Sequence, residues 1–165
     1  MIFLTVGSKE PFDRLVRAVD IWCADRQRDD VFGQIAEPGR NGYRPRNFEW
    51  ISFIKPNEVQ QYFEEADFIV SHAGMGTIIG ALTIGKPILI VPRQKAFNET
   101  RNDHQLGTVE RFRIRPGVRV ARTEAEVGPE LDGLVARHKE TNMGDVAPFA
   151  DETLINAIRS HIIGK

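Results

Sequence analysis

The chain has 165 residues, 41% hydrophobic and 27% charged, which is typical of one soluble globular domain and excludes a disordered or fibrous protein. Its 22 basic and 23 acidic residues give a formal net charge of −1, so no bulk basicity indicates a nucleic-acid partner. The single cysteine, Cys23, excludes an internal disulfide framework and favours a reducing compartment, the cytoplasm.

Short apolar runs alternate with stretches of helical periodicity along the chain. In chain order, the first half predicts a strand at 2–6, a helix from about 11 to 28, a strand at 31–35, a loop at 38–47, a strand at 50–54 and a helix from 56 to 66. The second half predicts a strand at 68–70, a helix around 78–82, a strand at 88–91, a helix near 102–111, a strand at 118–120, a helix capped by Thr123 and Glu126, and a terminal helix at about 151–163.

Strands that alternate with helices predict an α/β fold, a Rossmann-like doubly wound parallel sheet with helices on both faces. No repeat, low-complexity tract or linker divides the sequence, so we expect a single domain over residues 1–165. Right-handed crossovers place the strand-to-helix turns along one sheet edge, where such sheets bind ligands.

A glycine-rich turn follows the apolar strand at 68–70 and leads directly into a helix. Gly74 and Gly76 have no side chain to block a ligand, and the first helical N–H groups lack partners within the helix. This arrangement favours an anion, and phosphate best of all. The alternative is a tight turn with close helix packing and no ligand. His72 precedes the turn and is a candidate for the same site, although a lone histidine is more often packed or bonded to backbone.

Two familiar nucleotide-binding motifs come close to this segment without matching it. Residues 74–80 spell G-x-G-x-x-x-G, one residue off the dinucleotide fingerprint, and no acidic residue follows about 20 residues on. Residues 80–86 spell G-x-x-x-x-G-K, but Pro87 stands where a P-loop carries the Ser or Thr that holds magnesium. The sequence therefore supports neither a dehydrogenase nor a P-loop ATPase.

A second polar group, between residues 93 and 105, follows the strand at 88–91 and is expected at the same sheet edge. The carboxylate of Glu99 can accept two hydrogen bonds from a ribose diol, and the amide of Gln105 can bridge hydroxyl and phosphate oxygens. The alternative is a solvated loop in which Asn102 or Asp103 caps the following helix. Capping explains one residue of the group and not the whole of it.

Five segments together resemble the donor-binding C-terminal half of family 28 glycosyltransferases: MIFLTVGS at 1–8, PFDRL at 11–15, SHAGMGT at 71–77, GKP at 85–87 and NDHQ at 102–105. The resemblance covers residues 1 to about 122. It is closest to the free-standing form of this half, a soluble subunit in dolichol-linked N-acetylglucosamine transfer and in bacterial capsule and exopolysaccharide assembly. It implies the C-terminal, Rossmann-like half of a GT-B enzyme with a UDP-sugar as donor.

The resemblance also implies which residues contact the donor. Gly74, Met75, Gly76 and Thr77 would hold the diphosphate, Glu99 the ribose hydroxyls, and Gln105 with Asn102, Asp103 and His104 the sugar-phosphate side. Phe53 and Ile54 would meet the uracil ring, and the loop at Gly7 and Ser8 would face the acceptor half. His72, Ala73 and Arg93 complete the expected donor-binding set.

The reaction implied is inverting sugar transfer without a metal or other cofactor, by a chain that turns over poorly or not at all alone. Helical N–H groups would stabilise the charge on the departing UDP, while the general base, usually supplied by the other half of such enzymes, is unknown here. His72 is a candidate contributor. The implied partners are the UDP-sugar, a membrane-anchored acceptor-binding subunit and a lipid-linked sugar acceptor. Two alternatives stay open, a non-catalytic regulatory or scaffold module that binds nucleotide, and a transferase whose homodimer replaces the missing half.

We expect recruitment to the cytoplasmic membrane face through a partner or a surface. The longest apolar run, at 88–91, is far short of the roughly 20 residues that span a bilayer, and the block at 2–6 is too short for a signal peptide.

Two features of the second half bear on that recruitment. Five arginines without an acid lie between residues 111 and 122 and can face anionic lipid, although we favour a solvated face balanced by Glu124, Glu126 and Glu130. The terminal helix carries an aliphatic stripe, which we expect in the core. The alternative is that it docks on a membrane-anchored partner, with Phe149 and Ile163 among the contacts.

Overall fold

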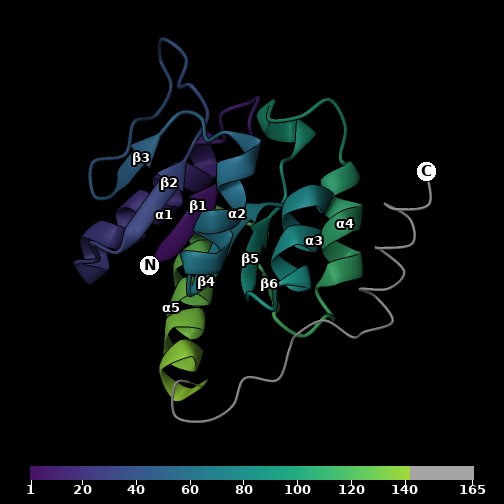
Figure 1. The fold of residues 1–165 in the computed structure, drawn as a ribbon. Helices are drawn as coiled ribbons and strands as arrows, with labels where there is room; N and C mark the ends of the chain where they lie inside the picture. The colour runs from purple at the N-terminus through teal and green to yellow at the C-terminus, as the bar shows by residue number, and fades with distance from the viewer. Residues whose placement is uncertain (142–165) are drawn as a thin grey trace.

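Residues 1–141 are described by the computed structural model, in which six parallel strands form one sheet with helices on both faces (Figure 1). The strands are β1 (Ile2–Thr5), β2 (Val31–Gln34), β3 (Glu49–Ile51), β4 (Phe68–His72), β5 (Ile88–Val91) and β6 (Val118–Val120). The helices are α1 (Asp13–Arg26), α2 (Pro56–Glu65), α3 (Met75–Thr83), α4 (His104–Phe112) and α5 (Glu124–Thr141), with a 3₁₀ turn η1 (Lys95–Phe97). This architecture confirms the predicted α/β, Rossmann-like parallel sheet. The predicted terminal helix at about 151–163, with Phe149 and Ile163, lies outside the described residues.

The strand order β3-β2-β1-β4-β5-β6 makes β1 and β4 the central pair of the sheet. From β1 the chain winds outward to β2 and β3, then returns to β4 and winds outward the other way to β5 and β6. The loops after β1 and β4 therefore diverge at the carboxyl edge, and a sheet of this kind binds ligands in the crevice between them.

Alternate side chains of the central strands enter two separate apolar layers. Ile2 and Leu4 of β1 pack in one buried cluster with α1 and α5, whereas Phe3 packs in the other cluster with α2, α3 and α4. The two clusters bury both faces of the central strands, which is why β4 and β5 read as continuous apolar runs rather than alternating ones. The two helical layers are visible on the two sides of the sheet in Figure 1.

The third strand, β3, is shorter than the predicted 50–54, because β2, its neighbour in the described sheet, ends first. β3 pairs with β2 up to Gln34 opposite Ile51, and the chain of β2 then turns at Ala36, whose φ of 60° is left-handed. Within residues 1–141, no strand lies beside the segment that follows Ile51. The Gln34 amide instead donates to the carbonyl oxygen of Ser52 (3.1 Å), which carries the chain out of the sheet.

The predicted loop at 38–47 is fixed onto α1 by a buried carboxylate. Asp20, 3% exposed, accepts hydrogen bonds from the Tyr43 hydroxyl (2.6 Å) and from the N–H groups of Arg46 (3.0 Å) and Asn47 (2.8 Å). A buried charge is tolerated when it is hydrogen-bonded in this way. The loop between β2 and β3 is therefore part of the folded layer over α1.

Among residues 1–141, no helix combines the length and apolar character that crossing a membrane requires.

Candidate functional site

A cleft of about 760 Å³ lies where β1, β4 and β5 end at the carboxyl edge of the sheet. Its walls are the loop between β1 and α1, the turn between β4 and α3, and the loop between β5 and α4. The residues that line it are Val6, Gly7, Ser8, Lys9, Glu10, His72, Gly74, Gly76, Thr77, Arg93, Thr100, His104 and Gln105. The cleft occupies the divergence of β1 and β4 that the sheet topology creates.

His72, the last residue of β4, fills the space between two glycines. A Cβ on Gly7, whose φ is +86°, would lie 3.1 Å from Cε1 of the His72 ring, and a Cβ on Gly74 would overlap its Nε2. At Gly76 nothing lies within 4 Å of an added Cβ. The two glycines of the predicted turn therefore differ: Gly74 makes room for the imidazole, and Gly76 keeps the backbone open to the cleft.

The imidazole of His72 is held neutral. Burial and, to a lesser extent, the positive charge of Arg93 lower its pKa to about 4, although a hydrogen bond with the backbone of Thr5 opposes part of the shift. Ser71 Oγ lies 3.3 Å from Nδ1 of the same ring. At neutral pH His72 is therefore an uncharged hydrogen-bonding group in the wall of the cleft.

The amino end of α3 opens into the cleft. Gly74 is the N-cap of the helix, and no side chain caps it. The N–H groups of the next three residues have no acceptor within the helix, and two of these residues, Gly76 and Thr77, line the cleft. The start of α3 therefore presents N–H donors and the positive end of the helix dipole to whatever occupies the cleft.

Arg93 forms the floor of the cleft, with 4% of its surface exposed. Its guanidinium donates to the carbonyl oxygens of Val6 (3.0 Å), Glu10 (2.6 Å) and Pro11 (2.7 Å) in the first loop. Its backbone N–H donates to Oε1 of Gln105 (2.9 Å). One buried cation thus ties the β1–α1 loop to the end of β5 and to α4, and its charge lies beneath the cleft.

The structure brings together most of the predicted donor-binding residues. Those that line the cleft are Gly7, Ser8, His72, Gly74, Gly76, Thr77, Arg93, His104 and Gln105. Those that do not line it are Phe53, Ile54, Ala73, Met75, Glu99, Asn102 and Asp103. Ile54 and Ala73 are buried in the apolar layer beneath α2 and α3, while Phe53 and Met75 are exposed at the same edge of the sheet.

Sequence reasoning missed Val6, Lys9, Glu10 and Thr100 as cleft residues. Val6, Lys9 and Glu10 continue the first strand into its loop, and the loop after the first strand borders the crevice of such a sheet. Their position directly after the first predicted strand could therefore have identified them as cleft residues. Thr100 carries no comparable signal, because its place depends on how the loop between β5 and α4 folds.

Asn102 and Asp103 form hydrogen bonds within the loop between β5 and α4. Asp103 is the N-cap residue of α4, but its Oδ1 accepts from the N–H of Lys95 (2.8 Å) instead of capping the helix. Asn102 Oδ1 accepts from the N–H of His104 (3.4 Å) and also contacts its ring. Of the two capping alternatives, Asn102 bonds the first helical N–H, and Asp103 stabilises the preceding turn.

Glu99 does not line the cleft and forms an ion pair with Arg14. Its Oε1 lies 2.8 Å from Nε of Arg14, its Oε2 lies 2.9 Å from Nη2 of Arg14, and Oε2 also accepts from the N–H of Gln94 (3.0 Å). The ribose contact expected of Glu99 stays a prediction, since its carboxylate already has three donors.

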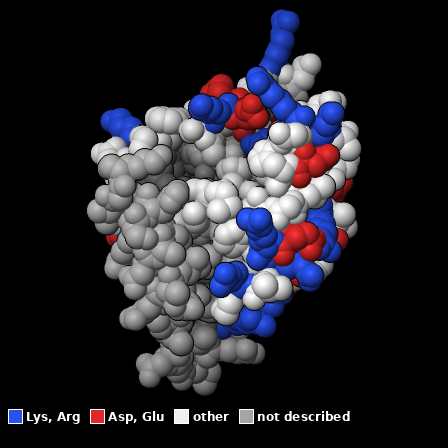
Figure 2. All heavy atoms as spheres, turned by 90° about the vertical axis from the view of Figure 1, so that its right-hand side faces the viewer, with Lys and Arg blue, Asp and Glu red and all other residues white. Residues whose placement is uncertain are grey.

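The arginine-rich segment at 111–122 mixes with acids on the surface. Arg113 and Arg122 both pair with Glu110, and Arg119 pairs with Glu130 at 2.7 Å. Figure 2 shows basic and acidic side chains interleaved on the side of the molecule that carries α3 and α4. These pairs agree with the balanced, solvated face that the sequence favoured, although Glu124 pairs with Arg14 rather than with this segment.

Residues 1–113 match the family described as glycosyltransferase family 28 C-terminal domain. Among curated proteins, the chain is 34% identical over 58 residues to the UDP-N-acetylglucosamine transferase subunit ALG13 of Debaryomyces hansenii, a match that covers 35% of this chain and 27% of that protein. The chain thus spans about a quarter of that relative's length.

Two solved structures share the fold. The NMR structure of ALG13 is similar with a TM-score of 0.55 and 18% identity, over 98% of this chain and 94% of that one. The glycotransferase of kitacinnamycin is similar with a TM-score of 0.55 and 22% identity, over 86% of this chain and 35% of that one. The family match extends over more than half of the sequence, and the chain belongs to the glycosyltransferase family 28 C-terminal domain family.

The two glycines of the turn are expected to respond oppositely to alanine. Gly74→Ala forces the methyl group into the His72 ring and should lower the free energy of unfolding by about 1–3 kcal/mol, the usual cost of overpacking. Gly76→Ala places a methyl group in open space within α3 and should be neutral or stabilising, by up to about 1 kcal/mol. Urea unfolding of both variants measures the difference; equal effects would contradict the assigned packing of His72.

His72 should make the stability of the fold depend on pH. Its folded pKa of about 4 lies below the ordinary value of 6.5, so its contribution is complete above pH 6.5 and is lost as the pH falls toward 4. Between these two pH values His72 is protonated in the unfolded chain and neutral in the folded one. This difference should lower the free energy of unfolding by about 3 kcal/mol once the pH reaches 4. Urea unfolding from pH 7 to 4 should show a steeper loss of stability in the parent than in His72→Gln. Parallel curves would mean that His72 titrates normally in the folded protein.

Proposed function

We propose that this family 28 domain is the donor-binding subunit of a two-component inverting glycosyltransferase. It would bind a UDP-sugar in the cleft and present it to a lipid-linked acceptor held by a membrane-anchored partner subunit. The family match supports the enzyme class, and the name of the yeast relative supports both UDP-N-acetylglucosamine as the donor and the role of a subunit. The observation that carries the proposal is the open amino end of α3 above the buried charge of Arg93.

The diphosphate is the part of the donor that this arrangement suits best. The helix dipole contributes about 0.3–1 kcal/mol, and up to about 2 kcal/mol when partly buried. A micromolar nucleotide needs about −8.2 kcal/mol, so further groups must contribute. Arg93 supplies a positive charge at the floor, and Gly76 lets phosphate oxygens approach the N–H groups without a side chain between them.

The remaining parts of the donor would extend in two directions from the diphosphate. Toward α4, the Gln105 amide offers its NH₂ group, since its Oε1 is taken by the backbone of Arg93. Toward β3, the Gln34 amide donates to the carbonyl oxygens of Gly7 (3.0 Å) and Ser52 (3.1 Å) and so ties the cleft wall to the segment that carries Phe53. The exposed ring of Phe53 is the proposed contact for uracil.

We propose transfer without a metal ion, in which α3 stabilises the leaving group. As the bond to the sugar breaks, negative charge grows on the departing UDP, and preorganised N–H groups stabilise such charge most strongly in the transition state. His72, neutral at working pH, would add a hydrogen bond within the same wall. The general base that deprotonates the acceptor hydroxyl would come from the partner subunit.

We also propose that the domain works at the cytoplasmic face of the membrane in polysaccharide or glycolipid assembly. Its single cysteine, which is buried, suits a reducing compartment. The partner subunit would supply the membrane anchor.

Calorimetry with UDP tests the proposal at the diphosphate. The parent should bind UDP in the micromolar range, and Gly76→Val should weaken binding at least about tenfold, or about 1.4 kcal/mol, because its side chain fills the space in front of the N–H groups. Gly107→Val is the matched control, since Gly107 is also a helical glycine with open space and does not line the cleft. It should bind UDP like the parent.

Absence of UDP binding by the parent would contradict the proposed donor. Turnover is then assayed by co-expressing the chain with a candidate membrane-anchored subunit and supplying UDP-sugars with a lipid-linked acceptor. Transfer that requires both chains is the expected result. Nucleotide binding without transfer in any such pair would instead favour a regulatory or scaffold module.

A further inference from the structure

We propose that Arg14 and Glu99 form a clamp that positions the loop between β5 and α4 against the cleft, and that Glu99 does not itself contact the nucleotide. The proposal rests on the proposed function, since it states how one wall of the UDP-binding cleft is held. It assigns both side chains a positioning role in place of the ribose contact that the sequence suggested for Glu99.

The geometry of the pair is that of a fixed hydrogen-bonded fork. Arg14 donates from Nε to Oε1 of Glu99 (2.8 Å) and from Nη2 to Oε2 (2.9 Å), two parallel bonds that set both planes. Each side chain is only 11% exposed, so water screens the pair little. Nη2 also donates to the carbonyl oxygen of Pro92 (2.8 Å), at the end of β5. The Arg14 guanidinium therefore bonds the loop at two points, Pro92 and Glu99.

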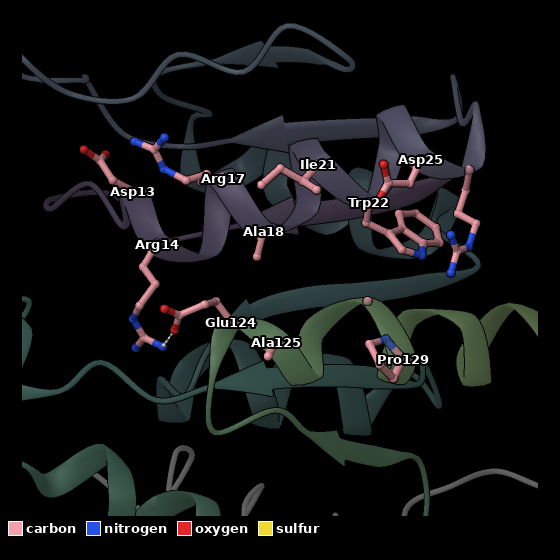
Figure 3. A pocket seen from close by; sticks show the side chains of 12 residues that line it. Asp13, Arg14, Arg17, Ala18, Ile21, Trp22, Asp25, Glu124, Ala125 and Pro129 are labelled. Carbon is pink, nitrogen blue, oxygen red and sulfur yellow. Dashed lines mark ion pairs between the residues drawn. The ribbon is translucent and has the colours of Figure 1, made fainter.

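Aromatic rings confine the guanidinium from two sides. Its central carbon lies 5.2 Å from the ring centroid of Phe12, which precedes α1, and 4.9 Å from that of Phe97 in η1. The third nitrogen, Nη1, reaches Glu124 at 3.5 Å and is buried without a hydrogen bond. Figure 3 shows Arg14 extending from α1 toward Glu124 at the start of α5. Arg14 thus connects α1 with the loop between β5 and α4 and with the start of α5, and these contacts restrict its side chain.

The Glu99 carboxylate also forms a hydrogen bond within its own loop, the one between β5 and α4. Besides Arg14, Oε2 of Glu99 accepts from the N–H of Gln94 (3.0 Å), which joins the two ends of the turn that contains η1. A carboxylate with three donors has little remaining capacity for a ribose diol. Neither Glu99 nor Arg14 lines the cleft. A ribose contact would first require the clamp to open.

Residues that line the cleft follow the clamp closely in the sequence. Thr100 follows Glu99, and His104 and Gln105 begin α4 a few residues later; all three line the cleft. Without the clamp, the segment 94–99 would lose its attachment to α1 and these residues would lose their fixed positions. A looser wall binds any nucleotide less tightly, whatever hydroxyls its sugar carries, because ordering the loop then opposes binding.

The test compares two nucleotides on matched variants. Arg14→Met and Glu99→Gln each remove one partner of the clamp, and Arg26→Met is the control, an arginine of the same helix paired with Asp132 outside the cleft. Calorimetry with UDP and 2′-deoxy-UDP should show both nucleotides weakened by the same factor, about tenfold or more, in both clamp variants and not in the control. The double variant should bind no more weakly than the weaker single variant, since the two residues act as one unit.

The opposite pattern would overturn the clamp. If Glu99→Gln weakened UDP but spared 2′-deoxy-UDP, while Arg14→Met bound both normally, Glu99 would be a ribose ligand. Should Arg14→Met not fold, Arg14→Lys keeps the charge but cannot form the two-bonded fork, and the same joint loss is expected.

Hydrogen exchange separates the clamp from the proposed function. A parent that binds no UDP would contradict the function and not the clamp. In that case the backbone amides of residues 94–99 should exchange faster in Arg14→Met than in Arg26→Met. Equal exchange rates would overturn the clamp.

Discussion

The cleft depends on the burial of one cation. Arg93 stands at the end of β5, more than 80 residues from the loop that its guanidinium holds, and it bonds three carbonyl oxygens there instead of a carboxylate. Carbonyl partners satisfy its hydrogen bonds, and the carboxylates of Glu10 and Glu99 attract its charge without bonding to it, so we expect positive potential in the cleft that Arg93 shares with the start of α3. The same charge helps to keep His72 neutral, which allows an imidazole to pack between Gly7 and Gly74 without a buried like charge beside Arg93.

Arg14, which is partly buried, differs from Arg93 in its bonding partners. Arg14 is neutralised by Glu99, so its contribution is position rather than potential. Arg93 holds the loop between β1 and α1, while Arg14 holds the loop between β5 and α4 through Pro92 and Glu99. Both act across the divergence of β1 and β4 that the strand order creates. We therefore infer that Arg93, which has no hydrogen-bonded carboxylate partner, contributes more to the proposed anion binding than Arg14 does.

Much of this molecule could be predicted from local sequence patterns. The apolar runs at β4 and β5 gave the parallel sheet, and the glycine turn after β4 gave the open helix start, because both are properties of a few adjacent residues. Local patterns placed the two polar loops at one sheet edge, but they did not reveal which side chains of distant segments pair with each other. Nothing near Gly74 in the sequence indicates that it serves His72 packing while Gly76 serves access. Likewise, nothing near Glu99 indicates Arg14, its partner 85 residues away. The shortened β3 has the same cause, since its end depends on where β2 turns.

The central claim is that the amino end of α3, above Arg93, binds the diphosphate of UDP. It is tested most directly by a titration of ¹⁵N-labelled protein with UDP, followed by NMR amide by amide. The account predicts that the largest shifts fall on the amides of Gly76 and Thr77 and spread to Gly7 and to the start of α4. A separate groove of about 640 Å³ between α1 and α5, shown in Figure 3, should stay unperturbed. Shifts centred on that groove, with the α3 amides unchanged, would contradict the account.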